Sequence, residues 1–119
     1  MSTKGKLRVL VCGSRHWSNR DAIEVVLSEL PPETVIIEGE ARGADSIARD
    51  VAKKLGFAIE PYPADWQRYG RSAGHIRNKQ MLVEGKPDLV LAFQEDASRG
   101  TQNMINLARA AGVRCVVYS

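Results

Sequence analysis

The sequence predicts an α/β domain with helices on both faces of a mostly parallel, five-stranded sheet, which gives three layers. Two observations lead to this class. Short apolar runs rich in β-branched residues alternate along the chain with amphipathic stretches of helical period. A strand–helix–strand alternation is typical of right-handed βαβ units, which build parallel sheets. The length adds a bound: 119 residues suffice for one core and leave no room for a second, so we expect residues 1–119 to form one domain.

Each predicted strand is an apolar run closed by glycine, proline or polar residues. The five runs are Leu7–Gly13, Thr34–Glu38, Phe57–Tyr62, Asp88–Phe93 and Val113–Tyr118. The third is expected near a sheet edge, because Pro61 cannot donate to a ladder. Residues 1–6 are expected to be flexible.

The predicted helices place apolar residues three and four positions apart and stop at proline or glycine. They run from Asn19 or Asp21 to Leu30, from Ala44 to Leu55, from Ser72 to Glu84, and from the segment Ser98–Thr101 to Gly112. The segment Pro63–Ser72 shows no clear period. The expected strand order is 3-2-1-4-5, the minimal Rossmann-like arrangement, which brings the loops after strands one, two and four together at one edge.

Composition excludes several classes of protein. No apolar run approaches the roughly 20 residues of a membrane span, and the N-terminus has no secretory pattern, so we expect a cytoplasmic protein without membrane contact. Cys12 and Cys115 lie in strand-like runs and are interpreted as small buried thiols. Two histidines are too few to suggest a metal site, and we expect neither metal nor cofactor. The net charge is only +3, but eleven of the basic residues are arginines, whose planar fork suits phosphate.

The segment Glu38–Asp45 follows the second strand and leads directly into a helix. Free N–H groups and the helix dipole favour an anion at such a place. The acids Glu38, Glu40 and Asp45 are candidates for ribose hydroxyls, and Gly39, Ala41, Arg42 and Gly43 for the phosphate wall. Plain turn chemistry, with Asp45 complementing the helix dipole, is the alternative.

Two further loops are expected at the same edge. Gly13, Ser14 and Arg15 follow the first strand without the G-x-G-x-x-G spacing of a dinucleotide site. Trp17, beside them, either stacks on a base or covers the sheet end. In the loop after the fourth strand, hydroxyls and a glycine at a helix N-terminus make an anion cradle, unless Ser98 is only an N-cap. We take this last segment, Ser98, Arg99, Gly100 and Thr101, as the better candidate for the main phosphate cradle.

The segment between the third and fourth strands supplies polar groups and flat aromatic surfaces. Asp65 and Trp66 come first, and Arg77 and Asn78 follow on a helix. The alternative is a surface loop packed by its own aromatics and a solvated helix face. His75 is interpreted as an ordinary surface histidine, because nothing pairs it with a nucleophile.

Taken together, these motifs resemble one known family. They are G-S-R at 13–15, E-G-E-A-R-G-A-D at 38–45, P-A-D-W at 63–66, A-G-x-x-R-N at 73–78 and S-R-G-T at 98–101. In this order they resemble the YspA-like branch of the SLOG superfamily. The resemblance implies a Rossmann-like fold, a site for nucleotides or nucleotide-derived ligands, and a role as sensor or effector in bacterial or phage conflict systems. Related proteins commonly form homo-oligomers, which we also expect here, although the sequence does not show which face pairs.

Two relatives suggest other functions. The cytokinin-activating LOG phosphoribohydrolases carry glutamates after a P-G-G-x-G-T motif, whereas Gln102, Asn103 and Met104 follow Gly100-Thr101 here. The DNA-processing protein A family is similar at residues 13–15 and 38–45, and it binds single-stranded DNA. We therefore expect nucleotide binding. One alternative is N-glycosidic hydrolysis with Glu38, Glu40 or Asp65 as the catalytic carboxylate, and another is single-stranded nucleic-acid binding.

Overall fold

The sheet has the predicted class and strand order. A computed structural model describes residues 6–95 and 98–119. Five parallel strands lie in the order β3-β2-β1-β4-β5. Their bounds are β1 Arg8–Gly13, β2 Val35–Glu38, β3 Ala58–Pro61, β4 Leu89–Phe93 and β5 Arg114–Tyr118. The third strand is an edge strand, as Pro61 predicts. Apart from Lys6, the predicted flexible start lies outside the described residues.

The helices follow the predicted order with shifted ends. They are α1 Arg20–Ser28, α2 Ala44–Leu55, α3 Trp66–Tyr69, a 3-10 turn η1 Gly70–Ser72, α4 Ala73–Gly85 and α5 Arg99–Ala110. Asn19 caps α1, because its side chain accepts a hydrogen bond from Ala22 N. Gly56 closes α2 in the left-handed conformation.

The segment between β3 and α4 contains two short helical turns for which the sequence showed no period. The segment Pro63–Ser72, interpreted as lacking a period, contains α3 and η1. A four-residue helix is too short to show a hydrophobic period, and none of its residues is buried. The local signal was Asp65, whose Oδ1 accepts a hydrogen bond from Arg68 N at 3.1 Å and so caps α3.

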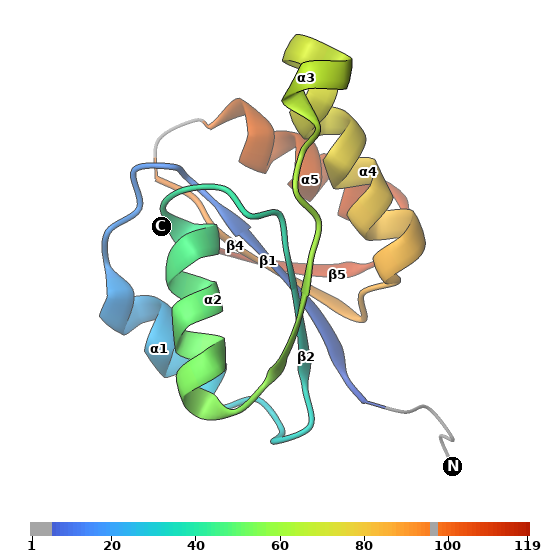
Figure 1. Ribbon diagram of the computed structural model, residues 1–119. Helices are drawn as coiled ribbons and strands as arrows, with labels where there is room; N and C mark the ends of the chain where they lie inside the picture. The colour runs from blue at the N-terminus through green and yellow to red at the C-terminus, as the bar shows by residue number, and fades with distance from the viewer. Residues whose placement is uncertain (1–5, 96–97) are drawn as a thin grey trace.

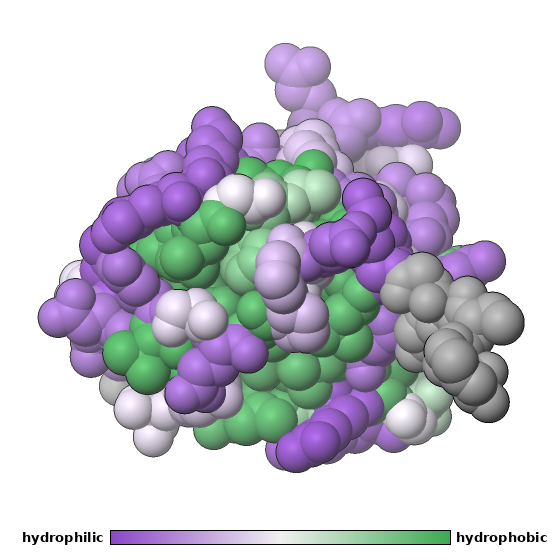
Figure 2. All heavy atoms as spheres, turned by 90° about the horizontal axis from the view of Figure 1, so that it is seen from below, coloured by the Kyte–Doolittle hydropathy of each residue, from purple (hydrophilic) through white to green (hydrophobic). Residues whose placement is uncertain are grey.

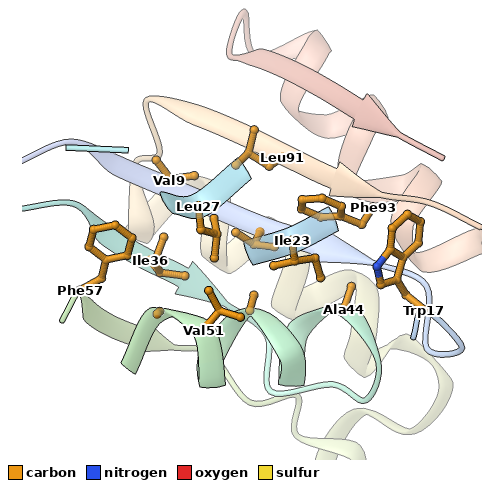
Figure 3. Packing of buried hydrophobic residues seen from close by; sticks show 13 residues of the cluster. Val9, Trp17, Ile23, Leu27, Ile36, Ala44, Val51, Phe57, Leu91 and Phe93 are labelled. Carbon is orange, nitrogen blue, oxygen red and sulfur yellow. The ribbon is translucent and has the colours of Figure 1, made fainter. Parts of the chain in front are cut away.

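Two apolar cores fill the layers on either side of the sheet. On one side, residues of α1 and α2 pack on β1, β2 and β4, as Figure 3 shows for Ile23, Leu27 and Val51. On the other side, Met81 of α4 and residues of α5 pack against β1 and β4. Figure 1 shows α4 and α5 together on that side, with α3 projecting past the end of α4. The loops after β1, β2 and β4 therefore meet at one edge, which we call the carboxyl edge.

The outer strand β5 is less covered than the centre of the sheet. Val116 and Tyr118 are only partly buried against the first core. Seen from below, hydrophobic side chains gather across the middle of the molecule with hydrophilic ones around them (Figure 2).

Both cysteines are free thiols; Cys12 is buried and Cys115 half-buried. Within residues 6–95 and 98–119, no helix is long and apolar enough to cross a membrane.

Candidate functional site at the carboxyl edge

Ser14 joins three loops at the carboxyl edge. Its hydroxyl donates to the Glu95 carbonyl and accepts from Glu95 N, both at 2.8 Å. Its carbonyl accepts from Ala44 N at 3.2 Å, at the start of α2. The side chain is 3% exposed. The hydroxyl predicted to face a ligand is thus engaged inside the protein, and Ser14 fixes the positions of the loops after β1 and β4.

Gly13 and Gly43 at this edge are required by the protein's own backbone, and Gly39 lies against the Arg77 side chain. A Cβ on Gly43 would lie 2.3 Å from the Ser14 carbonyl oxygen, and its φ of +71° is in the region that favours glycine. A Cβ on Gly13 would lie 2.3 Å from the Phe93 carbonyl oxygen. A Cβ on Gly39 would lie 2.5 Å from Nη1 of Arg77. The sequence predicted close approach to a ligand, and the structure shows close approach between loops.

Asp45 holds the loop between β2 and α2 in shape. Its Oδ2 accepts hydrogen bonds from Gly39 N at 3.0 Å and Ala41 N at 3.4 Å. Burial raises the pKa of Asp45 to about 6, although the charge of Arg77 and these hydrogen bonds oppose the shift. In the free protein this carboxylate serves the loop, and the ribose contact predicted for it stays a prediction.

Glu38 and Glu40 form a pair of carboxyl groups behind the same loop. Glu38 is fully buried, and its Oε1 accepts from Glu40 N at 2.7 Å. Among the described residues its Oε2 is buried without a hydrogen-bond partner. Burial, and next the Glu40 carboxylate, raise the pKa of Glu38 to about 8, so it is neutral at pH 7. Glu40 instead pairs with Arg49 of α2, and its pKa is lowered first by the hydrogen bond with Glu38 and then by the hydrogen bond with Arg49.

Arg77 and Asn78 tie α4 to two of the loops. Nη1 of Arg77 donates to the Gly39 carbonyl, and its Nε donates to Asn78 Oδ1 at 3.1 Å. Nδ2 of Asn78 donates to the Gly100 carbonyl at 3.1 Å and to Asn103 Oδ1 at 2.9 Å. Burial lowers the pKa of Arg77, while the charge of Asp45 opposes this. The structure therefore brings both residues to the carboxyl edge, rather than to a solvated helix face.

Trp66 and Arg15 lie over this corner from different elements. The Arg15 guanidinium carbon lies 5.7 Å from the centre of the Trp66 ring, a cation–π distance. Trp66 is 50% exposed. Trp66 Cη2 and Arg77 Nη2 both lie within 4 Å of the point where a Cβ on Gly74 would be. The positive charge of Arg15 lowers the pKa of Arg77, so the two guanidinium groups repel each other here.

Trp17 takes the second of its two predicted roles, and a base-stacking role is a correction. The side chain is 7% exposed, and its ring meets Phe93 edge-on with centroids 5.5 Å apart. Its indole N–H donates to the Asn19 carbonyl at 2.9 Å. Figure 3 shows Trp17 at the end of the core beside Phe93. The ring covers the sheet end and, being buried, offers little surface to a base.

The two helix N-termini at this edge differ. At α5, Ser98 Oγ accepts from Thr101 N at 3.4 Å and from Thr101 Oγ1 at 3.0 Å, the N-cap that the sequence offered as the alternative. At α2, the N-cap is Gly43 and no side chain caps the helix. The α5 segment as main cradle stays a prediction, but Ser98 already caps its first turn, whereas no side chain caps α2. The α2 N-terminus lies against the Arg15 backbone, since a Cβ on Gly43 would lie 2.5 Å from the Arg15 carbonyl oxygen.

The remaining predicted residues lie around the rim. Arg42 and Arg99 are exposed, and Gly100 has no heavy atom within 4 Å of its Cβ position. Sequence reasoning missed Arg49 and Asn103, the partners of Glu40 and Asn78. Arg49 lies one helical turn after Asp45, so helix periodicity was a usable signal for it. No cluster of three or more metal-binding side chains occurs in the part of the chain that the structure describes.

Comparison with known proteins agrees with the resemblance in the motifs. Residues 7–69 match the YspA, cpYpsA-related SLOG family. The Gene 61 protein of Mycobacterium phage D29 is 39% identical over 120 residues, which cover 93% of this chain and 95% of that protein. The X-ray structure of DNA processing protein A from Streptococcus pneumoniae is similar in fold, with a TM-score of 0.60 at 17% identity. That similarity covers 95% of this chain and 59% of the other, so the present chain spans about three fifths of its length. The chain belongs to the YspA, cpYpsA-related SLOG family.

Proposed function

We propose that this protein binds a nucleotide or nucleotide-derived ligand at the carboxyl edge, in the corner formed by the α2 N-terminus, Arg15, Arg77 and Trp66. One observation carries the proposal. The Arg15 guanidinium carbon lies 5.7 Å from the centre of the half-exposed Trp66 ring, Trp66 and Arg77 both lie within 4 Å of the Gly74 Cβ position, and the α2 N-terminus beside the Arg15 backbone has no side-chain cap. A phosphate between the two guanidinium groups offsets their repulsion and accepts from N–H groups in the first turn of α2 beyond Ala44, whose own N–H donates to the Ser14 carbonyl.

The proposed phosphate position follows from the contacts that Arg77 and Arg15 make within the protein. Arg77 uses Nη1 on Gly39, which fixes its position. Arg15 is exposed, and within residues 6–95 and 98–119 its guanidinium group lies over the Trp66 ring, so it can turn toward a ligand. Arg42 is exposed on the loop between β2 and α2. We therefore assign Arg15 to the mobile contact with phosphate and Arg77 to the fixed one.

The base position follows from Trp66. It is the half-exposed tryptophan, whereas Trp17 is buried. Aromatic faces stack on any base, so Trp66 gives affinity and leaves the identity of the base open. A ligand ring replaces or sandwiches the Arg15 guanidinium on this face. The proposed ligand thus joins an aromatic base to at least one phosphate.

Titration calorimetry with a panel of mono-, di- and cyclic nucleotides tests this proposal. Arg15→Gln removes one charge-assisted contact, worth about 1.5–3 kcal/mol, so we expect affinity to fall roughly 10- to 100-fold. Arg68→Gln is the matched control, because Arg68 lies over Tyr69 on α3, away from the α2 N-terminus. Absence of binding by every nucleotide at about 1 mM counts against the proposal.

Single-stranded nucleic-acid binding is the second candidate, and a specific observation favours it. Trp66 and Tyr69 are both exposed, and each lies beneath an arginine, Arg15 and Arg68 respectively. Alternating aromatic and basic groups form stacking platforms for single strands. In that case Arg68→Gln weakens oligonucleotide retention as much as Arg15→Gln does, whereas a mononucleotide site responds to Arg15→Gln alone.

The hydrolytic alternative receives less support from the contacts. The predicted carboxylates are engaged within the protein: Glu38 is fully buried and its Oε1 accepts from Glu40 N, Glu40 pairs with Arg49, and Asp65 caps α3. A general acid or base must reach the substrate. Release of free base from a nucleoside monophosphate, lost in Glu40→Gln, would reinstate hydrolysis.

A further inference from the structure

The outer face of α4 carries an apolar surface that no other described element covers. Among the described residues, six large hydrophobic side chains are exposed, and four of them lie on α3 and α4. They are Trp66, Tyr69, Ile76 and Val83, and the last two are 39% and 57% exposed. Ile76 and Val83 are seven positions apart, so they lie on the same face of α4 two turns from each other.

This face is hollowed into a groove of about 730 Å³. Residues of α3, η1 and α4 line it, among them Tyr69, Arg71, His75, Ile76, Val83 and Glu84. Figure 1 shows why it is concave, since α3 projects outward at the N-terminal end of α4. We call this surface the α4 groove. A groove along one helix with an apolar stripe fits another helix.

We propose that the α4 groove is a dimer interface, in which α4 of a second copy packs antiparallel to α4 about a two-fold axis between Lys79 and Gln80. The proposal does not depend on the ligand site, because Arg15, Trp66 and Arg77 do not line the groove. Its basis is the self-complementarity of the face, which an isologous interface requires.

The register of the pairing follows from the sequence of α4. An axis between Lys79 and Gln80 places Ile76 against Val83 of the second copy. By symmetry this contact forms twice in the dimer, so both apolar residues of each copy are covered. The same axis places His75 against Glu84 of the second copy. Arg71 lies one turn beyond His75 and can reach the same carboxylate. A parallel pairing would instead place Glu84 against Glu84, which like charges disfavour.

The residues at the axis are compatible with close packing. Lys79 faces Gln80 of the second copy, and both side chains are exposed in the free chain. Their aliphatic stems can cover the apolar pair while the lysine ammonium group stays in water. Because α4 has only 13 residues, the interface is smaller than the roughly 800 Å² per partner of a standard one. We therefore expect a weak dimer whose population depends on protein concentration.

Sedimentation equilibrium of the full chain, from about 5 to about 200 µM, measures the association. We expect the mass to rise with concentration from the monomer value of 13.1 kDa toward twice that value. Ile76→Glu and Val83→Glu should each weaken the dimer at least tenfold. Val25→Glu is the control, because Val25 is 61% exposed on α1, on the other side of the sheet. Thermal unfolding confirms that each variant is folded. If Ile76→Glu does not fold, Val83→Glu carries the test, because Val83 is the more exposed of the two side chains.

A charge exchange tests the register itself. Glu84→Lys should weaken the dimer, and the double variant His75→Glu with Glu84→Lys should restore it. Within one chain these positions are nine residues apart, about 13.5 Å along the helix, so only contact between copies explains a rescue. Three results overturn the proposal: a monomer at every concentration, equal weakening by Val25→Glu, or no rescue by the double variant.

Discussion

The substitution Gly43→Ala tests the way the carboxyl-edge loops are packed. Gly43 has φ +71° and ψ −122°, a region that costs a non-glycine residue roughly 1–3 kcal/mol. An added Cβ also meets the Ser14 carbonyl oxygen at 2.3 Å and the Arg15 carbonyl oxygen at 2.5 Å. Relieving such an overlap costs about 1–3 kcal/mol more. The expected destabilisation is therefore about 2–6 kcal/mol.

Gly70→Ala is the matched control for this effect. Gly70 has nearly the same backbone angles, φ +55° and ψ −131°, but no heavy atom lies within 4 Å of its Cβ position. It should therefore show the backbone strain without the overlap. Urea unfolding followed by circular dichroism compares the two free energies of unfolding, and we expect Gly43→Ala to be lower by about 1–3 kcal/mol. Equal destabilisation of the two variants would refute the claim that Gly43 is required by contact between loops.

Four further predictions follow from other contacts. The pKa of Glu38 is raised from the ordinary value of 4.5 to about 8 in the folded protein. The stabilisation that its protonated carboxyl group gives is therefore complete below pH 4.5 and is lost as the pH rises toward 8. Glu38→Gln should flatten that part of the stability–pH profile measured by urea unfolding. Asn78→Ala leaves the Gly100 carbonyl without its side-chain donor and should lower the free energy of unfolding by about 1–3 kcal/mol in the same assay. Trp66→Leu should abolish any change in tryptophan fluorescence on nucleotide binding, because the remaining tryptophan is buried. Gly100→Ala should raise the free energy of unfolding by up to about 1 kcal/mol, and with it the melting temperature, since its Cβ meets open space in the first turn of α5. A loss of stability would contradict this.

The fold was predictable because its signals are local and repeated. Apolar runs, Pro61 at an edge and the glycine that ends α2 each indicated the element that the structure contains. The short helix α3 was missed because four exposed residues leave no hydrophobic period. Its cap, Asp65, was visible in the sequence but was interpreted as a ligand contact.

The position of the candidate-site loops was predictable, whereas the contacts of their side chains were not. The sequence predicted Gly39, Arg77 and Asn78 as residues of one site, and in the structure hydrogen bonds join Arg77 to the other two at the carboxyl edge. It did not show that Ser14 and Asp45 are engaged by backbone groups from other segments, because such contacts depend on the tertiary arrangement. For the same reason the sequence left open whether Ser98 caps α5, and it did not show that α2 has no side-chain cap.

Two-dimensional NMR of the labelled chain during a nucleotide titration tests the central claim most directly. If the ligand occupies the corner between Arg15, Trp66 and the α2 N-terminus, the largest shifts should fall on the backbone amides of residues 39–46, on Arg15 and on the Trp66 indole N–H. The Trp17 indole N–H, which donates to Asn19 inside the protein, should barely move. Shifts concentrated at the start of α5, with residues 39–46 unchanged, would contradict the account.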